Sequence, residues 1–544
     1  MALEHPFGPK SALPGRAHAR TRESILHACF GAGFPYSMKL TGHTSCVNAL
    51  AFSRGEGRWL ASAGDDCKVL LWDLHQSDVT APSCSFGGPR ANVFTVDFSA
   101  SNRFVYSAGV DAIICKFDIS RGAAVRDGIY EGEPAAVYNE HEDNIRAVSC
   151  HPFQDEVFLS ASEDGSVQLH DGRAESRQSH AQSTLQQAGE FTDVQFHPRM
   201  EHIFVTSDAH GNVCLRDTRM AFGPLHQRTK KGVVRTYATM LARRTSPSYF
   251  HPDASSVRFN ADGSKMAVIF LHYLPTIYSV SDPLPLAVCS GRNLPDGNPP
   301  SDGMRSYSNC CSIKHGSFGA ANSSGSEYFS TGSDDFRGYI WKVPSLSALE
   351  EQRREIDNND WLSNEYPNVT AFTDGILSHP KYVPVELSTP TYRLHGHRSI
   401  INTALIHPVH PIIATSGIER HVFMHSPTAA SPFSPHFTLT STDVRVIPPS
   451  SVENQRRFLQ ALTGQSIDLP DDELGEDGGT IALFDEIIRQ EGDSSDIFAS
   501  ARRVNPRLHT PESSDSESEE ADTDEGSDSA VSARAVVARI IPDD

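Results

Sequence analysis

Residues 40–73, LTGHTSCVNALAFSRGEGRWLASAGDDCKVLLWD, decide the fold. Gly-His opens this stretch, Trp-Asp closes it, and the residues between them alternate as β-strands do, which is typical of one propeller blade. Four residues have the spacing of a polar clasp inside the blade: His43, Ser62, Asp66 and Trp72. In such a clasp the histidine and the aspartate hydrogen-bond across the blade, the serine links them, and the indole donates to the hydroxyl. A buried aspartate needs partners of this kind.

Weaker copies of this unit follow along the chain. They align on a polar residue six positions before the Trp position, namely Asp111, Asp164, His210, Asp335 and Glu419. From Asp66 to His210 these anchors are 45, 53 and 46 residues apart, close to the period of about 40–45 residues in such repeats. The copy at Asp335 ends in Trp341, and Gly396-His397 opens the last copy. The repeats therefore predict a propeller.

The number of blades follows from these copies and one degenerate segment. Residues 256–278 alternate like strands but lack the clasp, so we count them as a blade and predict an all-β, seven-bladed propeller over residues 37–427. The ring closes if residues 37–40 (SMKL) form the outer strand of the last blade, because an open end would leave an unpaired sheet edge.

Two insertions interrupt the repeats. Residues 220–247 carry a basic cluster: Arg228, Lys230, Lys231, Arg235, Arg243 and Arg244. A solvated loop is favoured over a nuclear-import or phosphate-binding patch, because only Tyr237 offers an aromatic stacking surface. Residues 344–390 separate the strand that ends at Trp341 from its expected outer partner, residues 391–394. Because this insertion joins a third strand to a fourth, we expect it on the broader face of the propeller.

The N-terminal segment, residues 1–36, should hold a disordered stretch, 1–19, and a short helix at 21–30. Ile25, Leu26 and Phe30 lie on one face of this helix. A helix this short is unstable alone, so it must dock on the propeller or on a partner.

The C-terminal segment, residues 428–544, should be a mostly disordered acidic tail with two short amphipathic helices at 452–464 and 480–492. Removing the chain after about residue 431 should therefore leave the propeller folded. Ser514 and Ser516 each have a glutamate three positions on, which suits phosphorylation by an acid-directed kinase. A tail that only aids solubility fits equally well.

The net charge of −21 is concentrated in this tail. From residue 465 onward there are 22 acidic residues against six arginines, a net of −16, so −5 remains for the rest and nucleic acid is not an expected partner. The ten cysteines include no C-x-x-C pair, which favours reduced thiols over disulfides or zinc. Neither a signal-peptide core nor a run of about 18 apolar residues occurs. We expect a soluble protein of the nucleus or cytoplasm with no membrane partner.

No catalytic constellation is present in the sequence. A Gly-rich phosphate loop, H-E-x-x-H and G-x-S-x-G are all absent. His395 and His397 lie two residues apart, but a histidine pair without carboxylate or cysteine neighbours is a poor metal site, and His397 already belongs to a clasp. We predict no metal, no cofactor and no enzymatic activity, so function should lie in the faces of the propeller.

The most specific functional feature is a pair of short motifs at the ends of strands in consecutive blades. They are His170-Asp171-Gly172-Arg173 and Arg216-Asp217-Thr218-Arg219, and neither Trp72-Asp73 nor Phe117-Asp118 has an arginine at the same offset. Arginines at equivalent places in neighbouring blades should project side by side from one face, as a fixed-charge anchor for a partner. The alternative is two ordinary arginines on the rim.

These motifs resemble the W-D-x-R box of the WD-repeat substrate receptors of cullin-4 RING ubiquitin ligases. The resemblance runs from about residue 40 to 427, is strongest in STGSDDFRGYIW and GHRSIIN, and looks closest to the WD repeat protein twenty-two group. It implies that Arg173 and Arg219 contact the propeller adaptor of the ligase and that Asp171 and Asp217 hold the turns that aim them. It also implies that the helix at 21–30 inserts into the adaptor.

This sequence departs from the family in two places. His170 and Arg216 replace the tryptophan of each box, which should weaken the packing beneath it. Leu271-His272-Tyr273 replaces an arginine-rich turn on the narrow face, where substrates are expected.

The predicted function is a substrate receptor that joins the ligase adaptor to an unknown substrate protein. A general WD-repeat scaffold, for a chromatin or RNA-processing assembly, is the first alternative. A propeller hydrolase is the second, and the absent catalytic motifs disfavour it.

Overall fold

The structure is a computed structural model. It describes residues 14–76, 79–120, 129–173, 180–246, 248–363, 369–376, 378–431, 434–451, 478–491 and 503–504, together with single positions between 454 and 460. No helix in these ranges is long and apolar enough to cross a membrane. All ten cysteines fall within them, and none forms a disulfide.

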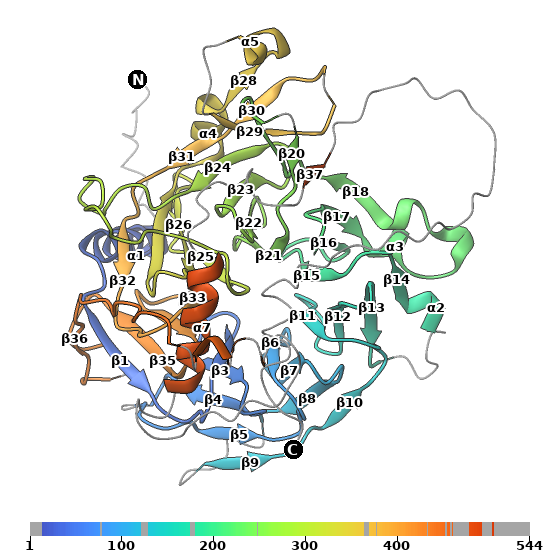
Figure 1. The fold of residues 1–544 in the computed structure, drawn as a ribbon. Helices are drawn as coiled ribbons and strands as arrows, with labels where there is room; N and C mark the ends of the chain where they lie inside the picture. The colour runs from blue at the N-terminus through green and yellow to red at the C-terminus, as the bar shows by residue number, and fades with distance from the viewer. Residues whose placement is uncertain are drawn as a thin grey trace, which may run out of the picture.

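Seven sheets are arranged around one axis (Figure 1), and each contains a blade of four strands, which a fifth strand extends in three of the sheets. From the innermost to the outermost strand, the first three blades are β2 (Val47–Phe52), β3 (Trp59–Gly64), β4 (Val69–Asp73), β5 (Cys84–Phe86); β6 (Val93–Phe98), β7 (Phe104–Gly109), β8 (Ile114–Asp118), β10 (Ala136–Tyr138); and β11 (Ile145–Cys150), β12 (Val157–Ser162), β13 (Ser166–Asp171), β14 (Thr184–Gln186). The next two are β15 (Phe191–Phe196), β16 (Ile203–Asp208), β17 (Val213–Asp217), β18 (Val233–Thr236); and β21 (Ala254–Phe259), β22 (Lys265–Phe270), β23 (Thr276–Ser279), β24 (Pro285–Cys289). The last two are β25 (Gly316–Gly319), β26 (Glu327–Gly332), β27 (Gly338–Val343), β32 (Tyr392–Leu394); and β33 (Ile401–Ile406), β34 (Ile413–Gly417), β35 (Glu419–Ser426), β1 (Tyr36–Leu40).

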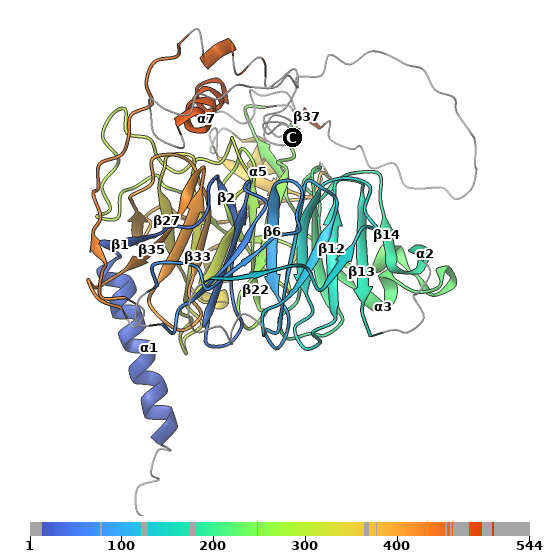
Figure 2. The same ribbon diagram turned by 90° about the horizontal axis from the view of Figure 1, so that it is seen from below.

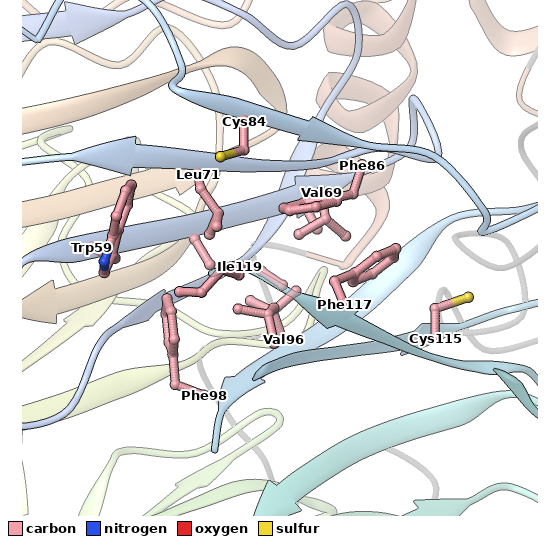
Figure 3. Close-up of a cluster of buried hydrophobic side chains, with 14 of the residues drawn as sticks. Trp59, Val69, Leu71, Cys84, Phe86, Val96, Phe98, Cys115, Phe117 and Ile119 are labelled. Atoms are coloured by element: carbon pink, nitrogen blue, oxygen red, sulfur yellow. The ribbon is translucent and has the colours of Figure 1, made fainter. Parts of the chain in front are cut away.

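The predicted propeller is therefore confirmed, and the pairing is consistent with seven blades. The ring closes as expected, because β1 pairs antiparallel with β35, with Ser37 opposite His425 and Leu40 opposite Val422. Apolar side chains fill the space between successive blades. Figure 3 shows the cluster between the first two, in which Trp59, Leu71, Phe98 and Phe117 interleave. Each blade buries its apolar surface only against its neighbours, so the ring is stable only as a whole.

The two insertions meet in a six-stranded accessory sheet beside the fifth blade. Its strand order is β28 (Arg354–Ile356), β30 (Lys381–Val383), β29 (Thr370–Thr373), β19 (Met240–Arg243), β20 (Tyr249–Phe250), β37 (Arg503–Val504). The pairing of β19 with β29 joins residues about 130 positions apart and could not be read from local pattern. Within the first insertion Arg228 donates to the carbonyls of Gly223 and Thr184, so this segment is not the simple solvated loop that we expected.

Short elements lie at the margins of the blades. The second insertion contains α4 (Leu346–Gln352), α5 (Asn358–Leu362) and β31 (Val385–Leu387). Because β31 pairs parallel with β24, this insertion runs along the outer edge of the fifth blade, which corrects the expectation that it lies on the broader face. The others are β9 (Tyr130–Gly132) beside β5, β36 (Thr438–Leu439) beside β1, α2 (His180–Ser183), α3 (Thr218–Ala221), and 3-10 turns at Leu225–Gln227 and Lys230–Gly232.

The N-terminal helix α1 (Pro14–Ala32) is longer than predicted. It begins at a proline, which suits the first turn of a helix because that position needs no N–H donor. Its C-terminal end docks on the propeller: Phe30 is fully buried and stacks on Tyr328, with the ring centroids 4.4 Å apart. The helix then projects beyond the ring on the side opposite α7 (Figure 2).

A second helix, α7 (Gly478–Glu491), lies over one face of the ring, which we call the helix face (Figure 2). Its apolar residues form one buried cluster with turn residues of three blades: Leu483, Phe484, Ile487 and Ile488 with Cys46, Cys311, Phe336, Ile400 and Ile418. Arg445 donates to both carboxylate oxygens of Asp485, at 2.8 and 2.6 Å. The expectation that the chain after residue 431 makes few fixed contacts is therefore wrong for this helix.

We predict that Ile487→Asp lowers the free energy of unfolding by about 3 kcal/mol, because it removes buried apolar surface and places an unpaired charge in the cluster. Gln490→Asp, at an exposed position of the same helix, should change it by less than about 0.5 kcal/mol. Chemical denaturation of the full chain measures both. Equal stability of the two variants would show that α7 does not hold the helix face.

Candidate functional site

The first blade contains a complete polar clasp. His43 Nδ1 lies 2.8 Å from Asp66 Oδ2, His43 Nε2 lies 2.8 Å from Ser62 Oγ, and the Trp72 indole donates to Ser62 Oγ at 2.9 Å. The carboxylate only accepts and the indole only donates, so the serine hydroxyl hydrogen must point to Nε2. Burial would raise the pKa of Asp66, but the hydrogen bonds from His43 and from two backbone amides hold that pKa below its ordinary value.

The third and seventh blades repeat this clasp with other residue types. His141 lies 2.9 Å from Asp164 and 2.6 Å from Ser160 Oγ, which in turn lies 2.9 Å from His170 Nε2. In the seventh blade the corresponding residues are His397, Glu419, Thr415 and His425, with three contacts of 2.8 Å. His141 was not identified from the sequence because no glycine precedes it. His141 lies 23 residues before Asp164, the same spacing as from His43 to Asp66, and this spacing is the sequence signal that identifies it.

The other predicted anchors have different partners. Asp111 accepts only from backbone amides, those of Arg90 and Ile113. Asp335 accepts from Arg337 and from the Tyr339 hydroxyl, and Trp341 donates to the Ser290 carbonyl, so no histidine clasp forms in the sixth blade.

In the fourth blade the acid is Asp208 rather than the position aligned at His210. Asp208 accepts from the amides of His210 and Asn212, and Arg216 Nε donates to Thr206 Oγ1 at 2.9 Å.

These contacts correct the expectation that the boxes are poorly supported. His170 and Arg216 both contact the hydroxyl of the second strand, as Trp72 does in the first blade. Both side chains are buried, and His170 stacks on Phe158 with the rings 8° from parallel. The strands that carry the boxes are therefore anchored although the tryptophans are missing.

The two boxes have the same geometry. Arg173 donates from Nε and Nη2 to the two carboxylate oxygens of Asp171, at 2.8 and 2.7 Å, and Arg219 does the same to Asp217, at 3.0 and 2.7 Å. These arginine hydrogen bonds lower the pKa of both carboxyl groups. More than half of each arginine side chain is exposed, 52% for Arg173 and 68% for Arg219. Each aspartate thus fixes a guanidinium at the surface, as two parallel hydrogen bonds do.

Both boxes lie on one face of the ring, which we call the arginine face. It is opposite the helix face: α3, which contains Arg219, lies at the far side of the ring from α7 (Figure 2). The same Asp–Arg pair recurs on the first two blades, where Arg58 binds Asp73 and Arg103 binds Asp118. Here the arginine precedes the second strand instead of following the third. These pairs were not identified from the sequence. Only the contact in the structure shows that an arginine before the second strand can bind the same aspartate position as an arginine after the third strand.

Histidine side chains link the loops of the arginine face. His151, His197 and His407 each follow the first strand of a blade and precede a proline. In each, Nδ1 accepts an amide of its own loop and Nε2 bonds a carbonyl of the next blade, those of Glu201, Gly263 and Gly57. This use of both nitrogens requires a neutral ring. Burial lowers the pKa of all three, that of His407 to about 3.

The remaining predicted residues fall in separate places. On α1, Ile25 is 57% exposed, Leu26 is partly buried and Phe30 is buried in the propeller. Ser514 and Ser516 lie outside the described residues. The turn Leu271-His272-Tyr273 lies against the accessory sheet, with Tyr273 in edge contact with Phe372. Among the described residues no group of three or more metal-ligating side chains occurs, and His397 is engaged in its clasp.

Comparison with known proteins supports the repeat assignment. Residues 35–73 and 132–171 match the family described as WD domain, G-beta repeat. The chain is 26% identical over 465 residues to DDB1- and CUL4-associated factor 5 of Homo sapiens and of Mus musculus, which covers 85% of this chain and 41% of the relative. It therefore spans about two fifths of the length of these relatives. This similarity confirms the resemblance predicted from the sequence.

Shorter matches involve other WD-repeat regions. The chain is 29% identical over 165 residues to Protein ALTERED SEED GERMINATION 2 of Arabidopsis thaliana, covering 29% of this chain and 21% of the relative. It is 29% identical over 122 residues to U3 small nucleolar RNA-associated protein 15 homolog of Xenopus tropicalis, covering 22% and 21%.

The clasp geometry predicts unequal effects of two equivalent substitutions. Asp66→Ala should destabilise the protein by about 2–4 kcal/mol, because it leaves the buried His43 without its acceptor. Asp111→Ala should cost about 1 kcal/mol, since only the backbone amides of its turn lose a partner. Thermal or chemical unfolding compares the two. A melting temperature for Asp66→Ala within about one degree of wild type would show that the clasp is not formed.

The linking histidines predict a loss of stability in acid. Their pKa is lowered on folding, so the unfolded chain binds more protons below about pH 6.5, and stability is present above that pH and lost as the pH falls. For His407 the contribution lost by pH 5 is about 2 kcal/mol. Denaturation at pH 7.5 and pH 5 should show a smaller difference for His407→Gln than for wild type. His226→Gln, at an exposed position, should keep the wild-type difference.

Proposed function

We propose that this protein is a substrate-recognition subunit of a cullin-4 RING ubiquitin ligase. In this proposal the arginine face binds the adaptor, DDB1, and another surface binds a substrate protein. The observation that carries it is the pair of Asp–Arg boxes, Asp171–Arg173 and Asp217–Arg219, with one geometry on neighbouring blades. It is supported by the similarity to a protein named for its association with DDB1 and CUL4.

The two guanidiniums suit a protein interface. Each is held by two hydrogen bonds to its own aspartate, which leaves the outer edge of the planar group free to donate to a partner. Because the side chain is already ordered, little conformational entropy is lost when the partner binds. Arg219 is further positioned by Asp217, which accepts its backbone amide and caps α3.

Helix α1 extends the same surface. Phe30 packs in the propeller and so fixes the C-terminal end of the helix there. The rest of the helix projects past the arginine face (Figure 2). Ile25 remains exposed on it and supplies an apolar contact of the kind that partners bury. Phe30 itself is used for docking on the propeller, so of the three helix residues Ile25 is the best placed to contact an adaptor.

The protein would act by proximity rather than by chemistry. Holding a substrate beside the ligase raises its effective concentration at the conjugating enzyme. Because α7 covers the turns of the first, sixth and seventh blades, the substrate would have to bind elsewhere on the helix face or along the rim. A general scaffold for an RNA-processing assembly is the second candidate, supported by the shorter match to the U3-associated protein.

The proposal is tested by substituting both box arginines. Arg173→Ala with Arg219→Ala should weaken binding of purified DDB1 by at least roughly thirtyfold, because anchors of this type are commonly interface hot spots. The matched control is Arg58→Ala with Arg103→Ala, which removes the same Asp–Arg chemistry from the two blades without a box and should have an effect below about threefold. Interferometry measures affinity, and a thermal melt checks folding. If wild type does not bind DDB1, or the folded box variant binds equally well, the general scaffold becomes the better account.

A further inference from the structure

Two apolar side chains are exposed on the arginine face, beside the boxes. Phe153 is 58% exposed in the loop between β11 and β12, and Met200 is 42% exposed in the loop between β15 and β16. The backbone places each loop against a box: the amide of Gly172 donates to the carbonyl of Glu156, and the amide of Thr218 donates to that of His202. The two apolar side chains therefore lie on the same two blades as Arg173 and Arg219.

The loops that carry these side chains are held rigidly and joined to each other. The amide of Phe153 donates to His151 Nδ1, and the amide of Met200 donates to His197 Nδ1. Across the gap between the blades, His151 Nε2 bonds the Glu201 carbonyl at 3.0 Å, and Gln154 donates to the Glu201 carboxylate at 3.1 Å. Because the backbone of these loops is already fixed, little conformational entropy is lost when a partner buries the exposed side chains.

Phe153 and Met200 occupy the loop between the first and second strands of a blade, and they occur only on the two blades that carry a box. The corresponding loops of the first, second, fifth and sixth blades, residues 53–58, 99–103, 260–264 and 320–326, contain no apolar side chain larger than alanine. In the corresponding loop of the seventh blade, residues 407–412, Val409 is partly buried and Ile412 is buried. Single exposed apolar side chains are common on protein surfaces, but exposed apolar groups that are rimmed by polar groups commonly mark a protein–protein interface. Gln154 and Glu201, the residues that follow Phe153 and Met200 in the chain, line one groove together with Arg173 and His202.

We propose that Phe153 and Met200 form the apolar centre of the adaptor interface, with Arg173 and Arg219 at its margin. This inference rests on the proposed function and names two further residues that would contribute to the affinity. The partner surface should offer an apolar pocket flanked by carboxylate or carbonyl acceptors, which would receive the two side chains and the outer edges of the guanidiniums. Such a centre with a polar rim is the usual arrangement of interface hot spots.

The experiment compares four forms of the full chain for binding to purified DDB1. Phe153→Ser with Met200→Ser should weaken binding at least tenfold, and Phe153→Leu with Met200→Leu should stay within about threefold of wild type, because apolar volume is kept. Leu362→Ser with Val446→Ser, which removes two exposed apolar residues away from this face, should bind as wild type. Val446 is on the helix face, next to Arg445, which binds Asp485 of α7. The melting temperatures of all forms should agree within about two degrees, since every changed side chain is exposed.

The outcomes separate the two proposals. Loss of binding in the serine variant and retention in the leucine variant support the apolar centre. If the serine variant binds as wild type while Arg173→Ala with Arg219→Ala does not, the apolar centre is overturned and the proposed function stands. If wild type shows no binding to DDB1, both fail.

Discussion

The hydroxyl in the middle of the second strand is the contact on which the best-formed blades depend. Ser62, Ser160, Thr206 and Thr415 hold this position. Each is contacted from the third strand by a side-chain nitrogen, and three residue types supply it: Trp72, His170, Arg216 and His425. The backbone ladder alone fixes which strands pair. The side-chain contact fixes how the third strand sits in the blade, and so where its last residues emerge. On two blades those last residues are the boxes.

The same polar network explains why the two faces differ. On the helix face the buried acids hold the entering turns, and those turns expose apolar residues that α7 covers. On the arginine face the linking histidines join the third blade to the fourth, the fourth to the fifth and the seventh to the first. Helix α7 thus covers the turns of three blades on one face, and the linking histidines fix loops on the other.

Local features could be predicted from the sequence because their determinants lie within one blade. The spacing from His43 to Trp72, the closing strand at residues 37–40 and the paired boxes all follow from a repeat of about 45 residues. The pairing of β19 with β29 and the docking of α7 could not be predicted in this way, because each joins segments that are far apart and carry no shared pattern. Arg58 and Arg103 illustrate a third case. They precede the second strand of their blade, whereas Arg173 and Arg219 follow the third, yet all four bind the aspartate that ends the third strand.

Closure of the ring by β1 has a consequence for how the chain is made. Strand β1 pairs with β35, the last strand of the repeats, so the seventh blade stays incomplete until nearly 400 residues after β1 have been synthesised. During that time β1 is an unpaired edge, and the first and sixth blades each lack one neighbour. This state is open to wrong strand pairing and aggregation. Contacts of such long sequence separation also slow folding. Production of this protein should therefore depend on chaperones that shield the open ring, and a fragment that lacks residues 36–40 should fail for lack of closure, although every repeat is intact.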